Sequence, residues 1–179
     1  AKYLRCVLIG MPTWFVIGIL VTFAPEFAKA LGVSGEIKGG DAIMYAYTGI
    51  VLGDLATGGL SQLLKSRLRV MFIFLTLSAV SIGIYLNAYG ASATTFYFLC
   101  GLLGFVTGFW VIFVTISAEQ FGTNLRATVT TTTPNFVRGA LVPMIWLFNF
   151  VQDQLMGLGP AAARINAGLI VGALVVLVS

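Results

Sequence analysis

Two charged residues, Asp54 and Arg138, lie inside otherwise apolar stretches, where a charge is costly unless it has a partner or a function. Asp54 stands eight residues before Gln62, so it lies roughly 12 Å above the helix end at about 1.5 Å per residue. Pro134, just before Arg138, lacks an amide hydrogen and opens room for an ion pair. We therefore expect an intramembrane charge pair between Asp54 and Arg138. It either titrates or re-pairs as the protein changes shape, or it is a static pair that fixes two helices.

Other chemistry is sparse. Histidine is absent from the chain, which removes the commonest general base and metal ligand. Cys6 and Cys100 lie in apolar segments, where a thiol behaves as a small hydrophobe, so we expect no disulfide. A six-helix intramembrane serine protease of the rhomboid type would need a serine and histidine pair, and the absence of histidine argues against this class. We predict no enzymatic activity, no catalytic residue, no metal site and no cofactor.

The elements that must position the charged residues are membrane helices. The chain is 59% hydrophobic and 9% charged, with a mean hydropathy of +1.00, whereas soluble domains are roughly half apolar and a quarter charged. Because one crossing needs about 20 apolar residues and a short turn, six crossings nearly exhaust the 179 residues. The basic residues are mostly in turns and do not cluster, which argues against nucleic-acid binding.

We predict one all-α, six-helix transmembrane domain over residues 1–179. The expected helices cover residues of about 4–27, 42–64, 70–88, 94–116, 127–151 and 160–179. Pro12 predicts a bend near residues 11–14, and Pro160 occupies the favoured first turn of the last helix. The short link at 65–69 forces its two helices to be antiparallel.

The distribution of lysine and arginine predicts the orientation of the bundle. Counted on alternate sides, one side carries Lys2, Arg5, Lys65, Arg67, Arg69 and Arg126, and the other carries Lys29, Lys38 and Arg164. Basic residues are enriched in cytoplasmic loops, so the first side is expected to be cytoplasmic and to hold both termini. The expected location is the plasma membrane or a bacterial inner membrane.

Glycines recur at a spacing of four residues at Gly49 and Gly53, and again at Gly104 and Gly108. Small residues at this spacing allow membrane helices to approach closely. The pattern therefore predicts tight helix packing at both places.

Aromatic residues offer candidates for the lining of a substrate cavity. Phe105, Phe109 and Phe113 recur every four residues, and Trp14 and Phe15 follow the first proline. We take Trp14, Phe15, Phe105 and Phe109 as candidate lining residues. Because aromatic residues make up 13% of the chain, a packing or lipid-facing role is equally open for each.

The segment 58–69, GGLSQLLKSRLR, resembles the G-x-L-[AS]-D-R-x-G-R-R pattern between the second and third helices of each half of major facilitator superfamily transporters. The matching residues are Gly58, Leu60, Ser61 and Arg67. Gln62 stands at the position of the acid, Leu63 replaces a basic residue, and Lys65 replaces the second glycine. The copy is degenerate, as copies in the second half often are.

A second segment, AEQFGTNLRA at 118–127, is similar to the A-E-x-[FL]-P-T-x-x-R-[AG] pattern between the fourth and fifth helices of such a half. Ala118, Glu119, Phe121, Thr123, Arg126 and Ala127 match, and Gly122 replaces the usual proline. The resemblance covers essentially the whole chain and implies one six-helix half. The degenerate first motif and the start without methionine favour the C-terminal half.

The resemblance implies a secondary transporter that moves a small solute by alternating access, in which two halves rock against each other. Coupling to a proton or another ion, as in a symporter, is open. The implied partners are the small-molecule substrate, the lipid bilayer and the other six-helix half. The first and fourth helices would line the cavity, the second and fifth would form the rocking interface, and the third and sixth would face lipid.

Glu119 is expected to form a cytoplasmic latch with Arg126 across its own loop, or with Arg67 and Arg69 on the other hairpin. Exposed ion pairs contribute only about 0–1 kcal/mol each, which suits a gate that must open. A static clasp between the loops is the other interpretation. For the chain as a whole, the alternative function is a self-contained six-helix membrane scaffold or pore.

Overall fold

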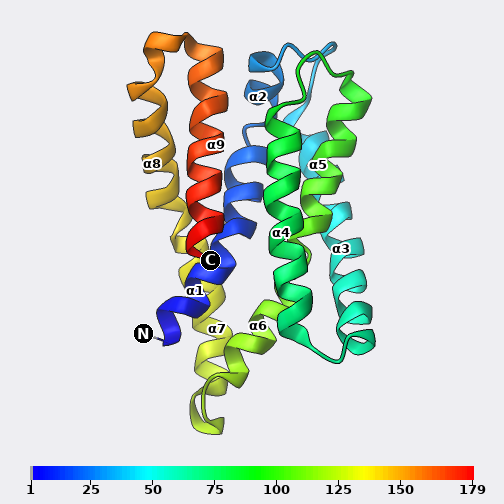
Figure 1. Ribbon diagram of the computed structural model, residues 1–179, viewed down its shortest axis with the longest axis vertical. Coiled ribbons are helices and arrows are strands. Elements are labelled where there is room, and N and C mark those ends of the chain that lie inside the picture. Colours follow the sequence, from blue (N-terminus) through cyan, green and yellow to red (C-terminus); the bar gives the residue numbers. More distant parts are fainter. Residues whose placement is uncertain (1) are drawn as a thin grey trace.

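The computed structural model describes residues 2–179, and helices form almost all of this part of the chain (Figure 1). They run alternately up and down. The links at 64–66 and 120–122 lie at one end of the bundle, and the turns around 31–38, 87–92 and 155–159 lie at the other. The elements are α1 (Lys2–Phe15), the π-helix η1 (Val16–Val21), α2 (Ala24–Ala30), α3 (Gly39–Leu63), α4 (Arg67–Leu86), α5 (Ala93–Thr107), α6 (Trp110–Glu119), α7 (Thr123–Gly139), α8 (Leu141–Gln154), the 3-10 turn η2 (Met156–Leu158) and α9 (Pro160–Val178).

Four helical stretches are long and apolar enough to cross a membrane. They are Lys2–Val21, Arg67–Leu86, Ala93–Glu119 and Pro160–Val178, with mean hydropathies from 1.9 to 2.2. The chain therefore has the helices of a membrane protein. The other long stretches are more polar, because α3 contains Asp41 and Asp54 and α7 contains six threonines.

The helix expected over residues 4–27 is divided into three elements. Pro12 lies inside α1, and the irregularity begins after it, at Val16. In the π-helix the amide of Thr22 donates to the carbonyl of Ile17 at 3.2 Å, five residues back. A side chain of the core supplies a hydrogen bond to this irregular backbone, since the buried hydroxyl of Tyr85 donates to the carbonyl of Leu20 at 2.9 Å. Residues 11–14, where the bend was predicted, lie within α1, and the irregular backbone begins at Val16.

The helices expected over 94–116 and 127–151 are also interrupted. The first divides at Gly108 and Phe109, between α5 and α6, and the second divides at Ala140, between α7 and α8. The helix expected from residue 70 begins at Arg67, because the side chain of Ser66 caps it by accepting from the amide of Arg69 at 3.4 Å.

The two glycine pairs, Gly49 with Gly53 and Gly104 with Gly108, lie in one interface between α3 and α5. A Cβ added at Gly108 would lie 2.6 Å from the Cα of Gly53, and one at Gly49 would lie 2.8 Å from the amide nitrogen of Phe105. Gly104 lies directly on the backbone of Ala46. The two glycine pairs therefore let the backbones of α3 and α5 touch.

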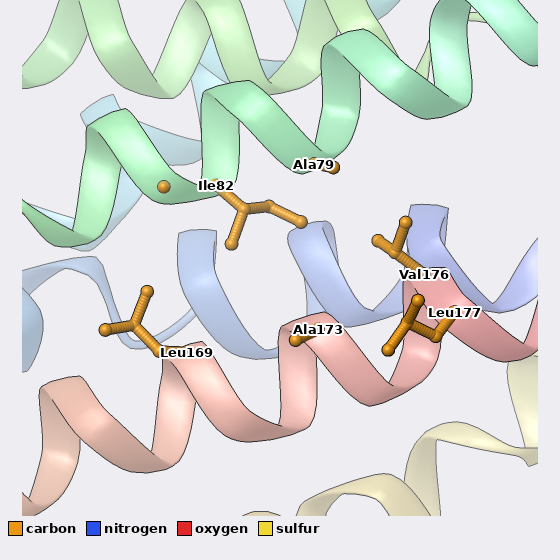
Figure 2. A pocket seen from close by; sticks show the side chains of 8 residues that line it. Ala79, Ile82, Leu169, Ala173, Val176 and Leu177 are labelled. Atoms are coloured by element: carbon orange, nitrogen blue, oxygen red, sulfur yellow. The ribbon is translucent and has the colours of Figure 1, made fainter.

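The outer surface of α4 and α9 is mostly apolar, with Arg67 and Arg69 exposed in the first turn of α4 and Thr76 two turns later. Beyond its first turn α9 exposes only apolar side chains, including Leu174 and Leu177. A groove of about 300 Å³ between the two helices is lined by apolar side chains and glycines alone (Figure 2). Its residues are Ala79, Ile82, Gly83, Leu169, Gly172, Ala173, Val176 and Leu177. Such a surface fits the hydrocarbon of a bilayer.

Candidate functional site

A second cavity, of about 230 Å³, has a different character because it contains both an acid and a base. It is lined from α1, η1, α3, α5, α6 and α7, and neither α4 nor α9 contributes. Its residues are Thr13, Trp14, Ile17, Tyr47, Ile50, Asp54, Thr107, Trp110 and Arg138. We refer to it as the charged cavity.

Asp54 and Arg138 both line the charged cavity, but among residues 2–179 they do not form the predicted ion pair. The guanidinium carbon of Arg138 lies 5.5 Å from the centroid of the Trp14 ring, in cation–π geometry. Its Nη1 donates to Oδ1 of Asn135 at 3.5 Å. The prediction of a contact between Asp54 and Arg138 was wrong, because the guanidinium instead contacts the indole ring of Trp14 and the side-chain oxygen of Asn135.

The charged cavity collects polar atoms that have no partner. Thr13 Oγ1, Trp14 Nε1 and Asp54 Oδ1 are buried, and each lacks a hydrogen bond within the described residues. Thr13 is only 7% exposed. A buried polar atom without a partner costs folding free energy, so three of them around one cavity indicate a place that is satisfied by water or a ligand.

Three of the helical interruptions lie beside this cavity. The π-helix begins two residues after Trp14, α5 ends at Thr107, and α7 ends just after Arg138. The break after α5 is tied to α3 by Thr57, whose fully buried hydroxyl contacts the carbonyl oxygens of Gly108 at 2.8 Å and Asp54 at 3.0 Å. Irregular backbone at membrane depth is tolerated where it lines a cavity or is buried in protein.

Only some of the four aromatic candidates line the cavity. Trp14 lines the charged cavity, whereas Phe15 and Phe109 are fully buried, each in a different hydrophobic core of the bundle. Phe105 packs against α3 and borders a shallow apolar groove with Gly49 and Leu52. The assignments of Phe15 and Phe109 to the cavity lining were therefore wrong, because their side chains point into the bundle.

Two aromatic lining residues, Trp110 and Tyr47, were missed. Trp110 begins α6 directly after the break at 108–109 and lies against Trp14, with ring centroids 6.3 Å apart at 74°. Tyr47 lies on α3 seven residues before Asp54, two helical turns along the same face. That spacing could have identified Tyr47, whereas the position of Trp110 depends on the break.

A polar stripe on α7 leads away from the charged cavity. Thr128, Thr131, Asn135 and Arg138 recur at spacings of three and four residues, and all four are exposed. Residues at these spacings share one face of a helix. An exposed polar face is costly in lipid, so this α7 stripe requires water or another protein surface.

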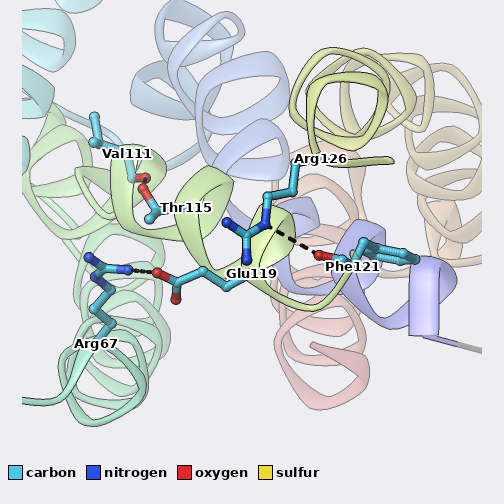
Figure 3. A network of polar contacts seen from close by, with 6 residues as sticks. All are labelled: Arg67, Val111, Thr115, Glu119, Phe121 and Arg126. Carbon is cyan, nitrogen blue, oxygen red and sulfur yellow. Dashed lines mark hydrogen bonds and ion pairs between the residues drawn. The ribbon is translucent and has the colours of Figure 1, made fainter. Parts of the chain in front are cut away.

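The predicted latch region has one ion pair. Glu119, at the end of α6, pairs with Arg67, at the start of α4, and both side chains are about half exposed, at 50% and 45% (Figure 3). Arg126 instead donates from Nε to the carbonyl of Phe121 at 3.4 Å. Arg69 is exposed and, within residues 2–179, makes no ion pair. Of the three arginines considered for Glu119, the structure therefore selects Arg67.

The remaining motif residues form the end of α3. Leu60 packs against the hydrophobic core that contains Phe109, and Ser61 Oγ donates to the carbonyl of Gly58 at 2.8 Å. Gln62 is exposed. Lys65, in the following turn, has a φ of +48°, a left-handed conformation that favours glycine.

In the part of the chain that the structure describes, histidine, cysteine and acidic side chains do not gather in groups of three that could hold a metal ion. Cys6 and Cys100 are both buried as free thiols. Comparisons of the chain with models of protein families, with curated proteins and with solved structures find no match.

Proposed function

We propose that this chain is one six-helix half of a secondary active transporter of the major facilitator superfamily, the C-terminal half, which moves a small solute by alternating access. Its six crossings are α1 with η1, α3, α4, α5 with α6, α7 with α8, and α9. The substrate would bind between this half and a second one, at the charged cavity.

The contrast between two surfaces carries this proposal. Beyond the first turn of each helix, α4 and α9 expose apolar side chains apart from Thr76, whose hydroxyl bonds within its own helix, so this surface needs no partner other than lipid. The helices around the charged cavity instead present Asp54, Arg138 and the exposed α7 stripe. A bundle with one polar side is incomplete in a bilayer, and a second half across a water-filled cavity would complete it.

The backbone of the α3–α4 turn supports the family resemblance independently of residue identity. Lys65 stands where the family pattern has its second glycine, and its φ of +48° is the conformation for which glycine is suited. The turn thus keeps a glycine geometry although the glycine is absent. Gln62, at the acid position, carries no charge, so Arg67 and Glu119 are the charged pair of this end.

Alternating access gives the interrupted helices and the weak latch a role. The interruptions beside the charged cavity are places where α1, the α5–α6 rod and the α7–α8 rod can bend. An exposed Arg67–Glu119 pair contributes at most about 1 kcal/mol, so it can form and break as that end closes and opens.

Counterflow tests the proposal. The intact protein that contains this chain is reconstituted in liposomes loaded with an excess of unlabelled solute, and uptake of the labelled solute is followed for a panel of small solutes. An alternating-access carrier accumulates label transiently above equilibrium, whereas a pore does not. We expect the overshoot for the intact protein and no uptake by the 179-residue chain alone.

Uptake by the 179-residue chain alone, or a gene that encodes no second six-helix block, would overturn the half-transporter. Uptake without overshoot would favour a pore, and no uptake of any kind by the intact protein would favour a scaffold.

Orientation is tested separately, by labelling single cysteines in a background in which Cys6 and Cys100 are replaced by alanine. We expect a membrane-impermeant maleimide to reach Lys65→Cys only from the cytoplasmic side, and Glu36→Cys and Asp153→Cys only from the opposite side. The reverse pattern would contradict cytoplasmic termini.

A further inference from the structure

The charged cavity holds one acid and one base that are not paired with each other. Asp54 and Arg138 both line it, and in residues 2–179 neither has an ion-pair partner. Arg138 is exposed beside the cavity and Asp54 is partly buried, so a charge pair that only stabilised the fold would be expected to bring the arginine onto the carboxylate, which is otherwise costly to bury. Because both charges line one cavity without pairing, a small molecule bound there would lie against both of them.

The Arg138 side of the cavity is built to hold an anion. The guanidinium lies over the ring of Trp14, which brings the indole of that residue to the same side. The indole N–H is buried and has no acceptor. A carboxylate placed there would accept from the guanidinium and from Trp14 Nε1, and charge-assisted hydrogen bonds of this kind are the strong ones.

The Asp54 side is built to hold a cation. One carboxylate oxygen, Oδ1, is buried without a donor. The cavity also presents the aromatic side chains of Tyr47 and Trp110. An ammonium group beside Asp54 would donate to the carboxylate and could contact these aromatic faces, whose electron density attracts cations. The buried Thr13 hydroxyl, also unpartnered, offers one further polar contact.

We propose that the charged cavity binds a zwitterion of amino-acid size, with its cationic group at Asp54 and its anionic group at Arg138. The volume of about 230 Å³ is smaller than the roughly 300–1,000 Å³ typical of sites for drug-sized ligands, which favours a small molecule. Ile17 and Ile50 supply apolar surface for a side chain. This inference rests on the proposed function, since the solute would be the one transported.

Binding to the intact purified protein tests the inference, measured by calorimetry and thermal shift with two matched sets of probes. One set is leucine, 3-methylbutylamine without the carboxylate, and 4-methylpentanoate without the amine. The other is phenylalanine, phenethylamine and 3-phenylpropionate. We expect at least one zwitterion to bind about tenfold or more tightly than either of its single-charge analogues. Equal binding within both sets, or no binding of either zwitterion, overturns the inference without any mutation.

Two variants test which residue binds which charged group of the zwitterion. Asp54→Asn should weaken the binding of the zwitterion about tenfold and leave the carboxylate probe unchanged, and Arg138→Gln should weaken the zwitterion and leave the amine probe unchanged. Asp153→Asn and Arg69→Gln, which remove exposed charges elsewhere, are the matched controls. Loss of the carboxylate probe in Asp54→Asn would reverse the assignment and contradict the proposal.

The two proposals fail in different ways. A protein that exchanges some other solute in counterflow but ignores both zwitterions overturns the zwitterion site and leaves the transporter. A protein that binds a zwitterion with this charge dependence but gives no counterflow overturns the transporter and leaves the site.

Discussion

The guanidinium of Arg138 lies 5.5 Å from the centroid of the Trp14 ring, although the carboxylate of Asp54 lines the same cavity. The aromatic ring, and not the acid, therefore holds the arginine in place. This arrangement leaves Asp54 Oδ1 without a partner and changes what mutation of Asp54 should do.

Asp54→Asn should not lower the stability of the fold, because no ion pair is lost and the charge removed has one buried oxygen without a hydrogen bond. We expect the melting temperature in detergent to stay the same or rise, while counterflow of the solute falls about tenfold or more. Asp153→Asn, at an exposed position, should change neither. A loss of about 3–5 kcal/mol of stability in Asp54→Asn would instead indicate a buried structural pair.

Gly104→Ala should destabilise the protein, because the added methyl group would lie 2.7 Å from the carbonyl carbon of Ala46. We expect a loss of about 1–3 kcal/mol in the free energy of unfolding, measured by denaturant titration. Gly83→Ala on α4 is the control, since its Cβ would meet no atom within 4 Å. That change should be neutral or stabilising by up to about 1 kcal/mol. Similar effects of the two changes would contradict backbone contact between α3 and α5.

Thr57→Val should cost about 1–3 kcal/mol of stability, because the carbonyl of Gly108 loses its donor at the break between α5 and α6. Thr57→Ser keeps the hydroxyl and should recover most of the loss. Thr76→Val is the control, because the exposed Thr76 bonds only within its own helix, to the carbonyl of Phe72. Equal stability of Thr57→Val and Thr76→Val would mean that the link across the break contributes nothing.

A double-mutant cycle should detect coupling between Arg67 and Glu119 and none between Arg126 and Glu119. We expect about 0.2–1 kcal/mol for the first cycle, decreasing at high salt, because the pair is half exposed. The changes are Arg67→Gln, Arg126→Gln and Glu119→Gln, read by thermal unfolding. Coupling confined to Arg126 would move the latch to the α6–α7 loop.

Lys65→Gly should stabilise the α3–α4 turn by about 1 kcal/mol, because glycine adopts the left-handed conformation of this residue without strain. Lys65→Ala removes the charge but keeps the Cβ, so it should leave the melting temperature nearly unchanged. If alanine and glycine stabilise equally, charge and not backbone conformation is the cause.

Composition and periodicity determine much of this protein. A mean hydropathy of +1.00 indicates elements suited to a bilayer, and the long apolar runs predict helices, which satisfy their backbone groups internally without water. Pro160 and the four-residue glycine spacings act locally, so they correctly indicate the start of α9 and two places of tight helix packing, but not that these two places meet each other. The sequence also singles out Asp54 and Arg138, because charges in apolar segments are rare.

Only the tertiary structure decides what these residues contact. Whether Asp54 meets Arg138 depends on the ring of Trp14, which comes from another helix far away in the sequence. Whether Phe109 or Trp110 lines the cavity depends on a break at Gly108, where Thr57 of α3 supplies the hydrogen bond that the helix gives up. Such contacts depend on how the helices pack side by side, and the helical pattern of one segment carries no information about its neighbours.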